Sequence, residues 1–124
     1  MSARSSESLA VERWEVQVRK GVLEFVVLAA LWSGRLYGLE LIRLLEGSAQ
    51  LAVPEGTLYP LLNRLRVDGQ VAAEWVEAEA GHPRKYYKLT AEGRRRVVHM
   101  ARFWRGFTAG IDEVLVPVLA ERKR

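Results

Sequence analysis

Basic side chains gather in one stretch of the sequence and give it the chemistry of a surface that binds polyanions. Between His82 and Gly106 there are eight basic residues against one acid, Glu92. The basic residues are Arg84, Lys85, Lys88, Arg94, Arg95, Arg96, Arg102 and Arg105. Such clusters neutralise phosphates, so the stretch indicates nucleic-acid binding. A solvated helix face with no ligand is the alternative.

A second set of polar residues recurs at helical spacing just before this stretch. Four leucines recur at i, i+3, i+4 and i+7 and predict a buried helix face: Leu58, Leu61, Leu62 and Leu65. The opposite face carries Glu55, Tyr59, Asn63 and Arg66. In the major groove, Asn can bind adenine and Arg guanine through paired hydrogen bonds, while Tyr59 and Thr57 suit phosphate oxygens. The pattern predicts a helix that can read DNA.

The residue types that enzymes use are not arranged for catalysis. His82 and His99 are seventeen positions apart and have no metal-ligand spacing. The sequence has no nucleophile elbow, no phosphate loop and no cysteine. We therefore expect no enzyme activity, no metal and no cofactor.

Composition indicates one soluble domain. The chain has 124 residues, of which 49% are hydrophobic and 27% charged, with a net charge of +4. Its longest apolar run, from Phe25 to Trp32, is eight residues, whereas a membrane span needs about 20. The first twenty residues contain acids and lack the apolar segment of a secretion signal. We expect a cytoplasmic protein without membrane contact.

Hydrophobic periodicity and chain breakers predict four helices that support these residues. The first covers residues 5–19, and the second starts at Lys20 and stops at Ser33-Gly34. The third lies between Tyr37-Gly38 and Gly47-Ser48, and the fourth runs from Pro54 to Gly69.

A β-hairpin and a long helix are predicted to follow. Residues 71–76 and 86–89 alternate with strand period around a turn at Ala80-Gly81-His82-Pro83. Thr90 is a suitable N-cap for a helix that starts at Ala91 and ends near Val116, before Pro117. The predicted fold is mostly α with a small β-hairpin: a winged helix-turn-helix (20–90) between an N-terminal helical extension (1–19) and a C-terminal dimerisation helix with a basic tail (91–124).

The last predicted helix is too long for the rest of the chain to cover. About 26 residues make nearly 40 Å of helix. We expect its apolar stripe to pair with a second copy in a two-fold homodimer. The stripe comprises Val97, Met100, Ala101, Trp104, Phe107, Ile111, Val114 and Leu115. The alternative is that this helix folds back over residues 9–18 of its own chain.

Several segments resemble, in their order and spacing, a known family. They are Lys20-Gly21-Val22-Leu23-Glu24, Leu36-Tyr37-Gly38, the run from Gly56 to Leu65, Asp68-Gly69, and the run from Arg84 to Gly93. Over roughly residues 20–115 the sequence resembles PadR-family transcriptional regulators of the short type with one C-terminal helix. The resemblance implies a winged-helix dimer that represses transcription from a palindromic operator. Arg66, where relatives often have an acid, and His82, where the wing tip is often more basic, depart from the family pattern.

The resemblance and the residue patterns together give the predicted sites. The resemblance places Tyr37, Gly56, Thr57, Tyr59, Arg84 and Lys85 near DNA. The full predicted DNA-binding set is Tyr37, Glu55, Gly56, Thr57, Tyr59, Asn63, Arg64, Arg66, Arg84, Lys85 and Lys88. Trp104, with Phe107 and Met100, is the predicted site for a planar aromatic effector, because two indoles related by symmetry can sandwich a flat ring. Simple packing of these side chains in the dimer core is the competing explanation.

Two other functions fit the same pattern. One is a protein-interaction module whose long helix docks another protein and whose basic stretch only aids solubility. The other is a ligand sensor with little DNA binding. A DNA-binding regulator predicts that affinity for duplex DNA falls as salt rises, and a flat salt response favours the alternatives.

Overall fold

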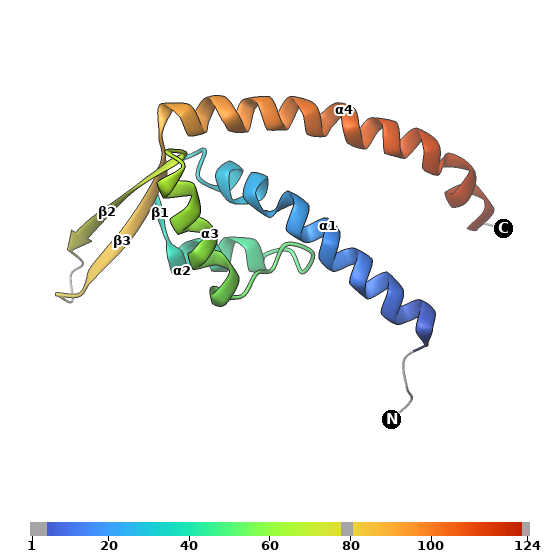
Figure 1. Cartoon of the computed structure of the whole chain (residues 1–124), viewed down its shortest axis with the longest axis horizontal. Helices are drawn as coiled ribbons and strands as arrows, with labels where there is room; N and C mark the ends of the chain where they lie inside the picture. The colour runs from blue at the N-terminus through green and yellow to red at the C-terminus, as the bar shows by residue number, and fades with distance from the viewer. Residues whose placement is uncertain (1–4, 78–80, 123–124) are drawn as a thin grey trace.

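The hairpin and the long last helix both extend from a small three-helix body in the computed structural model (Figure 1), which describes residues 5–77 and 81–122. Its elements are α1 (Ser6–Ala30), β1 (Leu36–Tyr37), α2 (Gly38–Glu46), α3 (Glu55–Val67), β2 (Val71–Glu77), β3 (Pro83–Leu89) and α4 (Ala91–Arg122). The chain is mostly helical with one small antiparallel sheet, which confirms the predicted fold class. The predicted wing turn includes Ala80, which lies outside the described residues, as do the last two residues of the predicted basic tail.

The core lies where α1, α2 and α3 meet the base of the sheet. All four leucines of the predicted α3 stripe are buried, together with side chains from α1, α2, β2, β3 and the start of α4. The buried hydrophobic residues of α1 and α2 are Val27, Leu28, Leu41, Ile42 and Leu45. The periodicity that predicted the buried face of α3 is therefore confirmed.

The sheet has a third strand that the sequence analysis missed. β1 pairs with β3, so the strand order is β1-β3-β2, and Tyr37 lies opposite Tyr86. An ion pair crosses the outer face of this sheet. The Arg35 guanidinium lies 4.6 Å from the centre of the Tyr86 ring, and its Nη1 lies 2.7 Å from Oε1 of Glu74 on β2. Arg35 thus ties the segment before β1 to the far strand.

The two helices predicted on either side of Lys20 form a single helix, so the predicted interruption was wrong. α1 begins after Ser5, whose side chain accepts a hydrogen bond from the Ser8 N–H at 3.1 Å, and continues to Ala30. Gly21 lies in its middle and no atom lies within 4 Å of the position where a Cβ would be. A glycine there costs the helix about 1 kcal/mol relative to Ala, which does not interrupt it.

α4 begins as predicted but extends past Pro117 to Arg122, so its predicted end was wrong. The Gly93 N–H donates to Thr90 Oγ1 at 3.0 Å, which confirms Thr90 as the N-cap, and the Thr90 hydroxyl donates to the Gly69 carbonyl at 2.6 Å. Gly93 is packed so closely on the Gln70 carbonyl that a Cβ there would overlap it. Pro117 is exposed, so water can hydrate the carbonyl that its missing N–H would have bonded.

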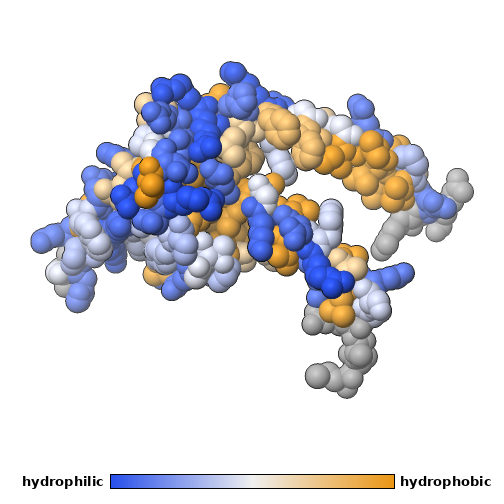
Figure 2. Space-filling view, in the orientation of Figure 1, coloured by the Kyte–Doolittle hydropathy of each residue, from blue (hydrophilic) through white to orange (hydrophobic). Residues whose placement is uncertain are grey.

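α1 and α4 touch near the body of the protein and then diverge (Figure 1). Phe25 and Trp104 meet with ring centres 5.9 Å apart, and Arg96 Nη1 lies 3.3 Å from Glu24 Oε1. Beyond this contact both helices expose apolar side chains, which Figure 2 shows along the distal half of α4. They include Leu9, Val11, Trp14, Phe107, Ile111 and Val114. α4 therefore does not fold back over residues 9–18, and the stripe stays uncovered within one protomer.

Val97 was predicted to lie in the dimer stripe of α4, but its side chain is buried within the protomer. It is 4% exposed and belongs to the protomer's own core, so it has almost no surface left to offer a partner. Its place in the seven-residue spacing reflects packing of α4 on the body of the same chain. Within the described residues, no helix is long and apolar enough to span a bilayer.

Candidate nucleic-acid interface

α3 is held from behind by its leucines and leaves its other face open. Leu58, Leu62 and Leu65 are fully buried and Leu61 nearly so. Every predicted DNA-binding residue of α3 is exposed: Glu55, Gly56, Thr57, Tyr59, Asn63, Arg64 and Arg66. The helix is thus fixed in place while its polar face can enter a groove.

Asn63 and Arg66 are hydrogen-bonded to each other. Arg66 Nη2 donates to Asn63 Oδ1 at 2.9 Å, as side chains three residues apart on a helix can. Each of the two was predicted to read a base separately. A base contact that uses Asn63 Oδ1 must therefore compete with the guanidinium of Arg66.

Gly38 is a positioning residue that sequence analysis recognised only as a helix start. The Tyr59 ring lies directly against it, and a Cβ at position 38 would sit 2.6 Å from Tyr59 Cζ. Gly38 is buried at the start of α2, whereas Tyr59 is 41% exposed. The absence of a side chain at position 38 lets Tyr59 lie across the start of α2 and keep one side open to solvent.

The two wing cations that sequence analysis grouped together lie on opposite faces of the hairpin. Arg84 pairs with Val76, and Lys85 pairs with Trp75 on the next position of the ladder. Side chains alternate along a strand, so Arg84 shares its face with Lys88 and Lys85 shares the face of the buried Tyr87. The Lys85 ammonium lies 5.8 Å from the ring centres of Trp75 and of Tyr87.

Tyr37 and Arg84 are brought together although they are far apart in sequence. The Arg84 guanidinium lies 4.6 Å from the centre of the Tyr37 ring, and Tyr37 meets Tyr86 edge-on at 5.4 Å. Cation–π contacts of this kind restrict a flexible arginine. Strand β1, which sequence analysis missed, is what places Tyr37 beside the wing.

Glu74, one of the two acids on β2, is already engaged. The hydrogen bond from Arg35, and secondarily the charge of Lys88, lower the pKa of Glu74 below its usual value, so this carboxylate stays ionised. On the inner face, burial raises the pKa of Tyr87 and keeps its hydroxyl neutral. In the part of the chain that the structure describes, no group of His, Asp and Glu could hold a metal ion.

This arrangement of helices and hairpin agrees with the results of sequence comparison. The profile of the PadR-like family of transcriptional regulators matches residues 27–99, which include α2, α3 and the hairpin. The chain belongs to the PadR-like family. PadR-family proteins are DNA-binding transcriptional regulators and not enzymes.

Solved PadR-family structures share this fold over most of the chain. A PadR-like transcription factor from Bacteroides fragilis is 38% identical, with 82% of this chain and 98% of that chain aligned and a TM-score of 0.68. A PadR-family regulator from Eggerthella lenta is 32% identical over 86% of this chain and 93% of that one, with a TM-score of 0.75. A PadR-like regulator from Bacillus cereus is 29% identical over 81% and 97%, with a TM-score of 0.74. No curated protein matches the chain.

The predicted effector residues of this PadR-family protein line a cavity between α1 and α4. Trp104 is 36% exposed, and its ring centre lies 6.4 Å from that of Phe107. The cavity, of about 730 Å³, has Met100, Trp104 and Phe107 on one side and Trp14 and Phe25 on the other. The predicted effector residues are therefore adjacent, and α1 contributes two aromatic rings that sequence analysis did not assign to this place.

Proposed function

We propose that the protein is a homodimeric repressor that binds a palindromic operator and is released by a planar aromatic effector, acting in the cytoplasm. The observation that carries DNA reading is the polar face of α3, exposed while its leucines are buried. We assign base contacts to Asn63, Arg64 and Arg66. We assign phosphate and sugar contacts to Tyr37, Gly56, Thr57, Tyr59, Arg84, Lys85 and Lys88. Glu55 is repelled by phosphates, so we assign it to the amino group of a cytosine, which donates to a carboxylate.

The dimer is supported by the uncovered stripe of α4. Val114 is 76% exposed, and Phe107 and Ile111 are about half exposed within a single protomer. A contiguous apolar stripe on a soluble regulator marks an interaction surface. We assign this interface to Met100, Ala101, Trp104, Phe107, Ile111, Val114 and Leu115, and we leave Val97 out because the protomer itself buries it. Two-fold pairing of such helices presents two copies of α3 to half-sites about one DNA turn apart.

The effector role rests on the cavity that contains Trp104. Aromatic rings from both α1 and α4 line it, so a flat ligand can contact rings on two sides. The competing explanation is that a second protomer fills this cavity with its own side chains. Trp104→Ala separates the two: effector binding predicts lost quenching of Trp fluorescence by planar aromatic compounds with DNA affinity retained, whereas packing predicts loss of the dimer.

DNA reading is tested by selecting genomic fragments with the full chain and measuring affinity for the recovered site by fluorescence anisotropy. Asn63→Ala and Arg66→Ala are each expected to weaken binding to that site by about 1–3 kcal/mol and to change binding to random duplexes little. Arg84→Ala is expected to weaken both alike. Arg43→Ala, on the exposed side of α2, is the matched control and should change neither.

Two results contradict this proposal. If all three variants act equally on selected and random duplexes, α3 does not read bases. If wild-type affinity does not depend on salt, the chain is a protein-interaction module or a ligand sensor.

A further inference from the structure

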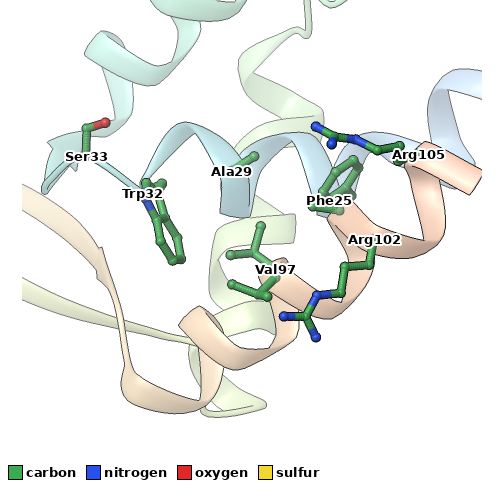
Figure 3. Close-up of a pocket in the computed structure, with 9 residues that line it drawn as sticks. Phe25, Ala29, Trp32, Ser33, Val97, Arg102 and Arg105 are labelled. Carbon is green, nitrogen blue, oxygen red and sulfur yellow. The ribbon is translucent and has the colours of Figure 1, made fainter.

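A second cavity lies on another side of α4, where the end of α1 meets it. It measures about 600 Å³, within the range of about 300–1,000 Å³ common for small-molecule sites. Figure 3 shows Trp32 on one side, Phe25, Arg102 and Arg105 on the other, and Ala29 and Val97 between them. Because a helix turns once in 3.6 residues, Arg102 points away from the centre of the α4 stripe assigned to the dimer, and Arg105 lies beside Ala101, which borders both the cavity and the stripe.

The charge around this cavity is entirely positive. A smaller hollow adjoins it, shares Trp32 and Arg102 with it, and adds Arg94, Arg95 and His99. The residues lining the two hollows include four arginines and no Asp or Glu. A concave surface with one sign of charge concentrates ions of the opposite sign.

Two of the arginines are free to bind a ligand. Neither Arg102 nor Arg105 has a hydrogen-bond acceptor or an acidic partner among residues 5–77 and 81–122. Arg96 on the same helix, by contrast, pairs with Glu24. Arginine presents a planar fork of donors that matches a phosphate group and binds it through two hydrogen bonds at once.

Trp32 offers an aromatic surface that is already held in place. The Arg94 guanidinium lies 4.7 Å from its ring centre and donates to its backbone carbonyl at 3.3 Å. Trp32 is nevertheless 44% exposed. Arg94 lines only the adjoining hollow while Trp32 lines both, so the indole keeps part of its surface for the cavity.

We propose that this cavity binds a ligand that carries both a flat ring and a phosphate group, that is, a molecule of the nucleotide class. The ring lies against Trp32 and the apolar floor, and the phosphate lies between Arg102 and Arg105. Four arginines without an acid favour a multiply charged phosphate over a single carboxylate. This site is distinct from the cavity at Trp104, which lies on the other side of the contact between α1 and α4.

The test is calorimetric titration of the full chain without DNA, at about physiological salt so that weak nonspecific attraction is screened. The probes are ADP, adenosine, which keeps the ring alone, and pyrophosphate, which keeps the charge alone. ADP is expected to bind at least about tenfold more tightly than either. Arg102→Gln and Arg105→Gln should each weaken ADP binding about tenfold and leave adenosine binding unchanged. Trp32→Leu should weaken both ADP and adenosine.

Arg43→Gln is the control for general loss of positive charge, and circular dichroism confirms that each variant is folded. The proposal is overturned if ADP does not bind, if pyrophosphate binds as tightly as ADP, or if Arg43→Gln has the same effect as Arg102→Gln. It is also overturned if Trp104→Ala, rather than Arg102→Gln, removes ADP binding. If ADP does not bind but Arg102→Gln weakens duplex binding, the arginines contact DNA instead. Because binding is measured without DNA, none of the results obtained with ADP depends on the proposed repressor function.

Discussion

Replacing Gly93 by Ala tests how α4 is fixed to the winged-helix domain. A Cβ at position 93 would overlap the carbonyl oxygen of Gln70 and lie 3.0 Å from its carbonyl carbon. The obstacle is backbone, which cannot rotate aside as a side chain can. The first turn of α4 must therefore move away from the turn between α3 and β2.

The expected loss follows from the bonds that this movement breaks. They are the Thr90 N–H to Gln70 carbonyl bond at 3.1 Å and the Thr90 hydroxyl to Gly69 carbonyl bond, whereas the Gly93 N–H to Thr90 Oγ1 bond lies within the first turn and moves with it. At about 1 kcal/mol each the two bonds amount to about 2 kcal/mol. The better helix propensity of Ala returns about 1 kcal/mol, so the free energy of unfolding should fall by about 1 kcal/mol.

Gly106→Ala is the matched control in the same helix. No atom lies within 4 Å of a Cβ at position 106, so this variant should gain up to about 1 kcal/mol from helix propensity alone. The assay is urea unfolding followed by far-UV circular dichroism, at one fixed protomer concentration because dimerisation adds to apparent stability. If Gly93→Ala is as stable as Gly106→Ala, the close contact between α4 and Gln70 is not what fixes the helix.

Three further outcomes are expected. Arg84→Gln should reduce the slope of log affinity for duplex DNA against log salt by about 1.8, that is, about 0.9 for each protomer of the proposed dimer, and an unchanged slope would mean that Arg84 does not contact a phosphate. The Arg35 hydrogen bond lowers the pKa of Glu74 below its usual 4.5. The stability that this carboxylate adds is therefore fully present above pH 4.5 and is lost as the pH falls through the lowered pKa of the folded protein. Urea unfolding at stepped acidic pH should show this loss in the wild type and less of it in Glu74→Gln, and identical curves would contradict the assignment. Val114→Glu should give monomers in sedimentation velocity, and a retained dimer would place the interface elsewhere.

The sequence predicted those parts of the fold that have a strong local pattern. The four leucines of α3 recur at helical spacing, and all are buried. α2 lies between Gly38 and Gly47 as its flanking residues indicated. The hairpin alternates with period two on both strands. In α2 and α3 the pattern within a few residues is also the pattern of burial, whereas in β2 the apolar Trp75 is exposed.

The missed features depend on contacts between distant residues or on solvent. β1 has two residues, too few to show alternation, and exists because β3 pairs with it about fifty positions later. The apolar pattern that starts at Lys20 suggested a separate helix, and Pro117 suggested a helix end. Both positions lie on exposed parts of long helices that continue through them, and at Pro117 water can hydrate the carbonyl left without a bond. Val97 fits the dimer stripe by spacing, and only the packing of α4 on the body shows that it belongs to the core.

The candidate site was predictable in its residue types but not in its geometry. Strand alternation alone could have separated Arg84 from Lys85, and the spacing of three could have paired Asn63 with Arg66. By contrast, the contact of Tyr59 with Gly38 and that of Arg84 with Tyr37 join different elements. No local pattern carries that information.

The divergence of α1 and α4 gives α4 the mechanical properties of a lever. Its 32 residues extend about 48 Å from the close contact at Gly93. A rotation of about 5° at that fulcrum moves the far end by about 4 Å, since displacement grows with distance along a rigid helix. A small change of packing between Phe25 and Trp104 is therefore amplified at the far end of α4. In the proposed dimer, where α4 pairs with its copy, such a change alters the distance between the two winged-helix domains.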